Sequence, residues 1–384
     1  MSRLHNCEKQ VWLGSYDKGK PRIRILIDAA HLSGLHVIEC NKDIWTDVED
    51  KSQNLTMLNA LRYGVRWLGS RPRMLARYLK LPKHQSVVFP YPGIADLLLF
   101  YPFVKLRGAK IFLDMFISIY DTVVNDRKLV DPKSMLAKVI FWVESLAGRC
   151  ADVVFLDTPT HAAYVHSLFN HTFDLPEYVP VGVEKAKFRR EGCRKWDGSR
   201  PLEILFYGQF APLQGTLYLA EAIAEWERHS ELSTHWTVIG IGQDSEQFDH
   251  TLKKAKVTNV QRIRWVKYVE LQKWIAGSDV CLGIFGTSEK ALNVIPNKVY
   301  QVLAVGRPIL TANTPGIRSL IAPSPAIELV KPGDSQAIVH GLRSLADRLK
   351  SSPEVMRRSV ENMPTVDSTQ VGKKLASVFT QGVG

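Results

Sequence analysis

Two glycine-containing loops in the second half of the chain carry residue types suited to holding a phosphate group. One runs from Tyr207 to Gly215 (YGQFAPLQG) and follows an apolar segment; the other is Pro296-Asn297-Lys298, at the start of a helical pattern. Glycines let backbone N–H groups approach a phosphate, and a helix N-terminus favours negative charge. Each loop alone equally fits a plain strand-to-helix turn. Together, with a fixed positive charge expected on Lys298, they predict a clamp for a nucleoside diphosphate.

The segment 279–316 supplies the elements that would position Lys298. Val280, Leu282 and Ile284 are strand formers, and Gly286 ends that pattern. Pro296 suits the first turn of the next helix, because its missing N–H costs nothing there. The pattern therefore predicts strand, loop, helix and strand, with the helix N-terminus beside the loop.

Strand and helix patterns alternate from about residue 10 and start again at residue 202, after a turn-rich basic segment. We expect an N-terminal domain over 1–184, a basic linker over 185–200 and a C-terminal domain over 201–362. The remaining segment, 363–384, contains a last amphipathic pattern that predicts a helix. The predicted class is α/β, with two facing Rossmann-like domains and a cleft between them.

Bulk composition indicates a globular protein without a disulfide framework or structural zinc. The 384 residues are 45% hydrophobic and 23% charged, and the five cysteines have no ligand-like spacing. The first residues lack the apolar run of a signal peptide, and no window holds 18 uninterrupted apolar residues. We expect a cytoplasmic protein, attached at most peripherally to the inner face of the cytoplasmic membrane.

Positive charge is concentrated in one stretch. The net charge is +12, and the stretch from Lys51 to Ala95 contains no Asp or Glu. Within residues 51–83, basic side chains alternate with aromatic and aliphatic ones. That pattern fits either a solvated basic helix face or an amphipathic element lying on an anionic membrane. Nucleic acid is not an expected partner, because no nucleic-acid-binding module accompanies the charge.

Polar residues in the first half are candidates for lining the expected cleft. Asp114 follows a predicted strand and Asp121 lies seven residues later; either could position a hydroxyl or act as a base. The alternative is that one of them caps a helix or pairs with Arg127. His161 beside Asp157 resembles a catalytic diad, but a helix-capping Asp and a surface His is the favoured interpretation.

The sequence resembles the GT-B glycosyltransferases of the retaining family four type (glycosyl transferases group 1). In the second half the resemblance lies in FYGQFAPLQG and IPNKVYQVLAVGRPILTANTP; in the first half it lies in LGSYDKGKPRIRILIDA, FPYPGIAD and FLDMFISIYDTVVNDRKL. It implies transfer of a sugar from a nucleotide-sugar donor to a glycan or lipid-linked acceptor. It implies no obligatory metal and no cofactor beyond the nucleotide-sugar itself. It also implies that the helix expected within 363–384 returns to the first domain.

The resemblance also assigns residues to roles. Asp114, Asp121 and Lys298 are the catalytic candidates. The donor-binding candidates are Gly208, Gln209, Phe210, Gln214, Gly215, Glu289, Pro296, Asn297, Lys298 and Gln301. The acceptor-side candidates are Gly14, Tyr16, Tyr91 and Gly93.

Three glutamines depart from the family pattern. The family's phosphate-binding Arg falls on Gln209, its Lys before glycine on Gln214, and its ribose-binding acid on Gln301. Glutamine still forms hydrogen bonds, but the three charges are gone. The sequence thus favours a glycosyltransferase in surface polysaccharide or glycoconjugate synthesis, with a catalytically silent glycan- or partner-binding protein as the alternative. A sugar-nucleotide epimerase fits less well, since it depends on more acidic residues and histidines than this chain offers.

Overall fold

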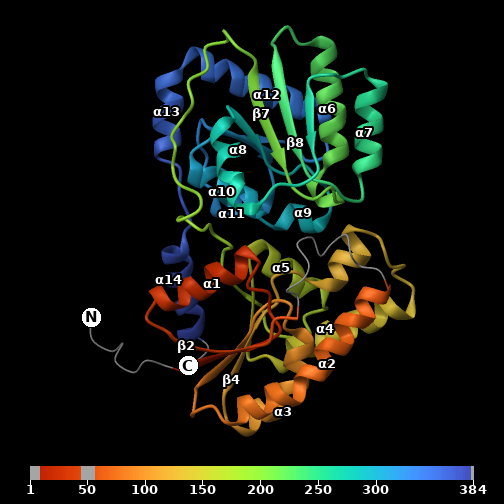
Figure 1. The fold of residues 1–384 in the computed structure, drawn as a ribbon, viewed down its shortest axis with the longest axis vertical. Coiled ribbons are helices and arrows are strands. Elements are labelled where there is room, and N and C mark those ends of the chain that lie inside the picture. The colour runs from red at the N-terminus through yellow and green to blue at the C-terminus, as the bar shows by residue number, and fades with distance from the viewer. Residues whose placement is uncertain (1–8, 45–56, 382–384) are drawn as a thin grey trace. The chain divides into compact units, whose positions relative to one another are not determined.

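The computed structural model describes residues 9–44 and 57–381, which form two α/β units (Figure 1). Unit 1 contains the chain up to Gly182 and again from Asp367 onward, and unit 2 contains Val183–Val366. Each unit is built on one parallel six-stranded sheet. The two sheets confirm the predicted α/β class.

Unit 1 has the strand order β2-β1-β3-β4-β5-β6. Its strands are β1 (Lys9–Gly14), β2 (His36–Asn41), β3 (Ser86–Phe89), β4 (Lys110–Asp114), β5 (Val153–Leu156) and β6 (Glu177–Tyr178). Its helices are α1 (Pro21–Leu32), α2 (Met57–Leu79), α3 (Ile94–Leu106), the π-helix η1 (Asp121–Asp126), α4 (Met135–Cys150), α5 (Pro159–Leu168) and α14 (Ser368–Gln381).

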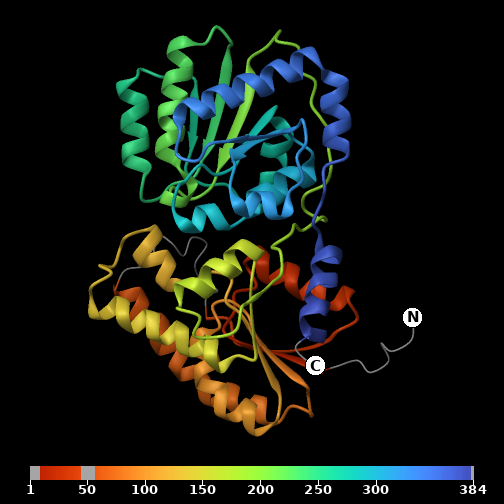
Figure 2. The same cartoon turned by 180° about the vertical axis from the view of Figure 1, so that it is seen from behind.

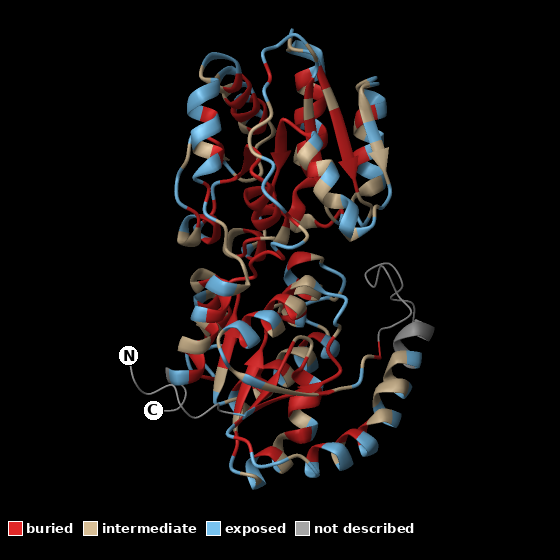
Figure 3. Ribbon diagram, turned by 60° about the vertical axis from the view of Figure 1, so that its left-hand side comes forward, coloured by how far each residue is buried: buried red, intermediate tan, exposed pale blue. Residues whose placement is uncertain are grey.

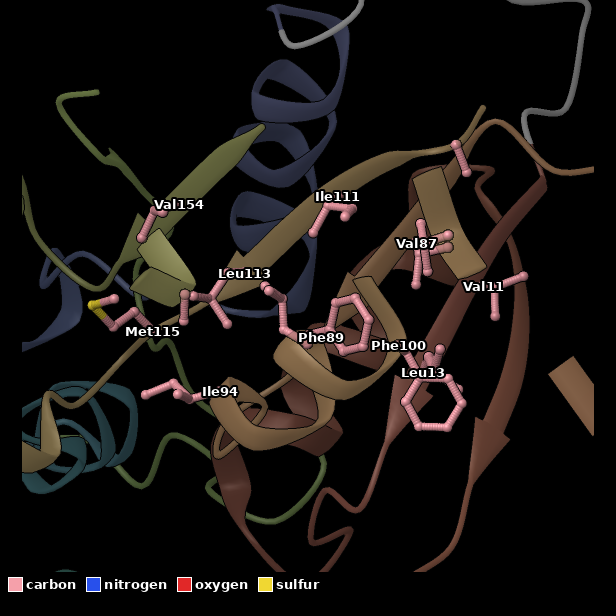
Figure 4. Close-up of a cluster of buried hydrophobic side chains, with 14 of the residues drawn as sticks. Val11, Leu13, Val87, Phe89, Ile94, Phe100, Ile111, Leu113, Met115 and Val154 are labelled. Atoms are coloured by element: carbon pink, nitrogen blue, oxygen red, sulfur yellow. The ribbon is translucent and has the colours of Figure 1, made fainter. Parts of the chain in front are cut away.

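The helices of unit 1 form two layers, one on each face of the sheet. Helices α1 and α14 pack against each other on one face, while α2, α3 and α4 cover the other (Figures 1 and 2). The core on the second face lies between α3 and the central strands (Figure 4). There Phe100 of α3 packs with strand residues such as Leu13, Phe89 and Leu113, which alternate with residues that point to the opposite face.

Unit 2 has the strand order β12-β11-β10-β7-β8-β9. Its strands are β7 (Leu202–Tyr207), β8 (Thr234–Ile239), β9 (Val260–Ile263), β10 (Val280–Leu282), β11 (Ile309–Ala312) and β12 (Ile327–Val330). Its helices are η2 (Pro212–Gln214), α6 (Thr216–His229), α7 (Ser245–Lys254), η3 (Tyr268–Glu270), α8 (Leu271–Gly277), α9 (Glu289–Asn293), α10 (Asn297–Val305), α11 (Pro315–Leu320), α12 (Ser335–Ser351) and α13 (Pro353–Glu361).

The sheet of unit 2 reverses its strand order beside β7, the first strand of the unit. From β7 the chain moves outward through β8 to β9, then crosses to β10 on the other side of β7 and continues to β12. Helix α6 lies between α7 and α12 on one face, while α8 and α10 contact each other (Figure 1). In such sheets ligands bind at the carboxyl ends of the strands beside the reversal, here β7 and β10.

The basic segment 185–200, expected as a linker, belongs to unit 2 instead. Arg190 donates hydrogen bonds to the carbonyl oxygens of Glu361 and Met363, and Arg200 forms an ion pair with buried Asp279 at 2.6 Å. Arginine carries five donors, so these side chains tie the segment to the surrounding backbone, which charge alone did not reveal. The chain crosses between the units at Gly182–Val183 and again at Val366–Asp367.

Some local features differ from simple sequence rules. Helix α2 runs without a break from Met57 to Leu79, although it contains Gly64, Gly69 and Pro72. The segment after β4 contains the π-helix η1. Pro296 is not the first residue of α10 but its N-cap, one position earlier. Helices α9 and α13 and strand β12 were not predicted.

Candidate functional site

The candidate donor site is built where β7 and β10 end in unit 2. The loop after β7 leads through η2 into α6, and the loop after β10 leads through α9 to α10. The two loops touch, since the Phe285 N–H donates to the Gln214 carbonyl oxygen at 3.0 Å. A methyl group at Gly215 would lie 2.4 Å from the Phe285 carbonyl carbon, so only glycine permits this approach.

Two helix N-termini open at this edge without a side-chain cap. Helix α6 begins after Gly215 and α10 after Pro296, and neither N-cap residue supplies a side-chain acceptor. By contrast, Ser288 caps α9 by accepting from the Ala291 N–H. Uncapped first-turn N–H groups are the feature of a helix that binds phosphate.

Lys298 lies buried between these loops, not on their surface. Its Nζ donates to the Gly283 carbonyl oxygen at 3.1 Å and lies 3.8 Å from the centre of the Phe206 ring. Burial lowers the pKa of the Lys298 ammonium well below its usual value. Lys298 is therefore a buried residue, and its surroundings work against the charged form that was expected of it.

Gly208, Gln214 and Lys298 meet at one point. A methyl group at Gly208 would lie 3.0 Å from Gln214 Oε1 and 3.1 Å from Lys298 Nζ. Gln214 Oε1 is buried, and no group in the described part of the chain donates a hydrogen bond to it. Rotating the amide would place its NH₂ donors at the same point, suited to an anion. Three of the predicted residues thus form one compact cluster.

Gln301 lies one turn of α10 further on, and two tyrosines hold its side chain. The Tyr207 hydroxyl donates to Oε1 at 2.9 Å, and Nε2 donates to the Tyr268 hydroxyl at 3.3 Å. Tyr207 opens the predicted loop but was given no role, and Tyr268 was not predicted to belong to the site. Burial raises the pKa of Tyr207 far above its usual value, so its hydroxyl stays a donor.

Four other predicted donor residues are not among the side chains that meet at Gly208, and they differ in burial. Phe210 is fully buried, with its ring packed against Phe248 and under the Arg262 guanidinium, so it belongs to the core. Gln209 and Glu289 are exposed, and Asn297 is partly buried in the first turn of α10.

Asp114 in unit 1 is part of a buried ion pair. Arg22 Nη2 lies 2.9 Å from Asp114 Oδ1, and both side chains are almost completely buried. The same guanidinium donates to the carbonyl oxygens of Val179 and Pro180. Burial raises the pKa of the Asp114 carboxyl, and the Arg22 charge opposes that shift. This carboxylate is paired with Arg22, and no local sequence pattern connects the two residues.

Asp121 begins the π-helix and is also buried. Its Oδ1 accepts from the Tyr164 hydroxyl at 2.6 Å and from Asn125 Nδ2 at 3.0 Å. No described group donates to its Oδ2, which is inaccessible to solvent.

The interpretation of Asp157 and His161 as a cap and a surface residue was wrong. Thr158 caps α5 by accepting from the His161 N–H at 3.0 Å. Asp157 instead lies 2.5 Å from His161 Nδ1, and both side chains are buried. Threonine is as good a cap as the neighbouring aspartate, which frees Asp157 for the imidazole.

The predicted acceptor-side residues lie at the carboxyl ends of β1 and β3. Tyr16 is completely buried and donates to Glu39 Oε2 at 2.9 Å, so it has no exposed atom for an acceptor. Tyr91 packs edge-on against Phe116, and burial raises its pKa to about 12. Gly14 and Gly93 are buried where the chain turns out of the strands, and a methyl at Gly93 would lie 2.8 Å from the Pro90 carbonyl oxygen.

Known proteins resemble this chain at two levels, in the sequence of unit 2 and in the fold of both units. Residues 201–348 match the family model described as glycosyl transferases group 1. Sucrose-phosphate synthase from Thermosynechococcus elongatus is similar over 97% of this chain and 98% of its own, with a TM-score of 0.68 and 13% identity. The fold is GT-B.

Two further structures share the GT-B fold. HepE from Anabaena, solved in complex with UDP, matches 97% of this chain and 99% of its own, with a TM-score of 0.63 and 11% identity. The catalytic domain of starch synthase IV from Arabidopsis thaliana, bound to ADP and acarbose, matches 83% of this chain and 76% of its own, with a TM-score of 0.62 and 13% identity. No curated protein matches the sequence. These findings confirm the resemblance to group 1 GT-B glycosyltransferases.

Two hollows, one in each unit, lie away from the Lys298 cluster. One in unit 2 is lined by Glu203, His235 and Ser278, which mark the amino ends of β7, β8 and β10. One in unit 1 is lined by Lys110, Asp152 and Glu177, also at amino ends of strands. We assign neither to the donor, because the uncapped helix N-termini of unit 2 lie at the opposite edge of its sheet.

Proposed function

We propose that this chain is a glycosyltransferase that moves a sugar from a nucleotide-sugar donor to a glycan or lipid-linked acceptor in surface polysaccharide or glycoconjugate synthesis. The observation that carries the proposal is the cluster of Gly208, Gln214 and Lys298 between the uncapped N-termini of α6 and α10. Support for a nucleotide comes from fold relatives that were solved with UDP or ADP.

The cluster suits the departure of a diphosphate. When the bond between sugar C1 and the phosphate oxygen breaks, negative charge grows on the leaving group. Lys298 Nζ and the first-turn N–H groups of α6 and α10 can stabilise that charge where water is excluded. Retention of configuration and independence from a metal ion stay predictions; the anomer of the product and activity in EDTA would test them.

A titration with nucleoside diphosphates tests the donor site. UDP, GDP and ADP should be compared by calorimetry, and one of them should bind. Lys298→Met keeps an apolar stem in the buried position beside Phe206 but removes the ammonium. We expect that variant to bind the preferred nucleotide about 10- to 100-fold more weakly, the effect of losing a hydrogen bond from a charged group.

A surface lysine provides the matched control. Lys253 lies exposed on α7 of the same unit, so Lys253→Met should bind like the unaltered protein. If Lys298→Met also binds normally while remaining folded, the diphosphate does not lie at this cluster.

The alternative is a catalytically silent GT-B protein that binds a glycan or a partner enzyme. It is favoured by Gln301, whose amide is held by Tyr207 and Tyr268 where the family places a ribose-binding acid. Such a protein would bind none of the three nucleotides and would release no sugar from any nucleotide-sugar. Binding of one nucleotide with donor hydrolysis or transfer would exclude this alternative.

A further inference from the structure

Helix α3 of unit 1 is apolar on the side that faces away from the core. Its buried side follows the spacing expected of a core helix, with Ile94, Leu97, Phe100 and Val104. Its exposed side repeats the same spacing with Ala95, Leu99, Pro102 and Leu106. Leu106 is 85% exposed. A surface helix normally presents polar residues outward, so this face calls for a covering partner.

The neighbouring helices extend the same surface. Most large apolar side chains that are exposed in the described part of the chain lie on α2, α3 and α4: Val65, Leu68, Leu79, Leu99, Leu106, Met135, Leu136, Val139 and Trp142. On α4, the exposed residues Met135, Val139 and Trp142 follow helical spacing and form a ridge. Figure 3 shows exposed positions along the outer side of α2.

The three helices are packed side by side. Trp67 Nε1 of α2 donates to Asp96 of α3 at 2.9 Å, and Arg107, just after α3, donates to the Leu79 carbonyl oxygen at 3.0 Å. Helix α4 packs against α3 on its other side (Figures 1 and 2). Their outer sides therefore form one surface, which we call the docking face.

The exposed charges carried by the three helices of the docking face have one sign, and Asp152, just beyond α4, pairs with Lys105 of α3 at 2.7 Å. The only acidic residues of the three helices are Asp96 and Glu144, and both are buried. Asp96 is paired with Arg71, and Glu144 accepts from backbone N–H groups and Ser118. The exposed charges are basic, and they include Arg62, Arg73, Lys138 and Arg149.

We propose that the docking face binds an anionic membrane surface. Aliphatic side chains and Trp142 would enter the boundary between headgroups and acyl chains, and the basic residues would meet lipid phosphates. A second copy of the chain fits less well, since two identical basic faces would repel each other. The proposal goes beyond sugar transfer. It extends the membrane attachment considered for residues 51–83, which include α2, to α3 and α4 as well. Within that range Arg71 cannot contact lipid, because it is buried in its ion pair with Asp96.

Vesicle flotation of the full chain without nucleotide tests the proposal. Vesicles of equimolar phosphatidylglycerol and phosphatidylcholine should carry the protein upward, and vesicles of phosphatidylcholine alone should carry much less. The double variant Leu106→Ser, Trp142→Ser should bind the anionic vesicles at least about tenfold more weakly, through the loss of buried apolar area. The triple variant Arg62→Gln, Arg73→Gln, Lys138→Gln should lose about 100-fold, at roughly fivefold per charge.

Exposed apolar residues of unit 2 supply the control. Trp265→Ser, Val269→Ser removes side chains of comparable exposure and should leave vesicle binding unchanged. Lys298→Met should also bind vesicles normally, which separates this test from that of the donor site. The proposal fails if the unaltered protein does not float with anionic vesicles, or if the control loses as much binding as the docking-face variants. It also fails if Leu106→Ser, Trp142→Ser turns a dimer into a monomer and leaves vesicle binding intact.

Discussion

The protonation of Lys298 couples the candidate donor site to pH. Its ammonium is buried against Phe206 with a carbonyl oxygen as hydrogen-bond acceptor, and burial lowers its pKa well below the usual value. A diphosphate placed beside Nζ would raise that pKa again, because it favours the charged form. Binding of the nucleotide should therefore take up a proton when the pH lies above the lowered pKa of the empty site.

The same shift predicts how stability depends on pH. The folded pKa is lower than the unfolded value of about 10.4, so the unfolded chain binds more protons between the two pKa values. This residue's contribution to stability therefore rises with pH across that window, and charging Lys298 penalises the fold at lower pH. Lys298→Met should therefore raise the melting temperature most at a pH close to or below the lowered pKa of the folded state. The increase should be smallest at about pH 10, where the unfolded chain also loses this proton.

Thermal melts of Lys298→Met and the unaltered protein across this pH range would measure the effect. Lys253→Met, at an exposed position of α7, should leave the difference near zero at every pH. A Lys298→Met variant that is less stable than the unaltered protein at low pH would contradict the assignment of a weakly held proton.

Two arginines show that residue spacing can predict which side chain is buried but not which partner it pairs with. Arg22 lies in register with Leu26 and Ala29 on the buried side of α1, and Arg71 lies in register with Met74 and Tyr78 on that of α2. That register was a usable signal of burial. Their partners Asp114 and Asp96 come from distant parts of the chain, and no local pattern indicates which carboxylate an arginine will meet.

At the scale of elements, the approach of two loops decides the shape of the candidate site. Gly215 has φ +66°, and a methyl group there would meet the backbone of Phe285 and Gly286 at 2.4 and 2.5 Å. Gly215→Ala should therefore destabilise unit 2 by about 2–4 kcal/mol, through strain and overpacking. It should also weaken nucleotide binding, because the N-terminus of α6 begins at this residue.

Urea unfolding followed by circular dichroism would measure the loss. Gly277→Ala is the matched control, since a methyl at the end of α8 meets nothing within 4 Å. It should change stability by less than about 1 kcal/mol, in the stabilising direction. Equal stability of the two variants would mean that the loops move apart without cost.

Strands and long helices were predictable because their patterns are local. The strands β1, β7 and β10 begin at Lys9, Leu202 and Val280, within a residue of where the sequence patterns place them. The short elements α9 and β12 were missed, since tertiary contacts rather than periodicity hold them. In the site, the glycine loops and the position of Lys298 followed from sequence. The burial of Lys298, the core position of Phe210 and the tyrosines around Gln301 did not, because they depend on packing between distant segments.

At the scale of the whole molecule, the two ends of the chain build unit 1 around the insertion of unit 2. Helix α14 follows the second crossing and packs against α1, where a methyl at Gly372 would lie 2.6 Å from the Ala29 carbonyl oxygen. Its buried residues include Leu375 and Phe379, and the Phe379 ring lies 4.6 Å from that of Phe112. One face of the unit 1 sheet thus depends on residues that follow the whole of unit 2.

None of the helices in the described residues combines the length and apolarity needed to cross a bilayer. The proposed membrane contact lies on the face of unit 1 opposite to α1 and α14 (Figures 1 and 2). Changes to α14 should accordingly act on stability and leave the docking face itself in place.

Shortening the core residues of α14 should destabilise unit 1 and spare unit 2. Leu375→Ala and Phe379→Ala each remove a buried side chain, at a cost of about 2–5 kcal/mol. Lys373→Ala, at an exposed position of the same helix, should change stability by less than about 0.5 kcal/mol. Hydrogen exchange measured by mass spectrometry should then speed up across β1 to β6 and stay unchanged across β7 to β12. Equal acceleration in both sheets would mean that the units unfold as one, and acceleration confined to α14 would mean that the helix only covers a sheet stable without it.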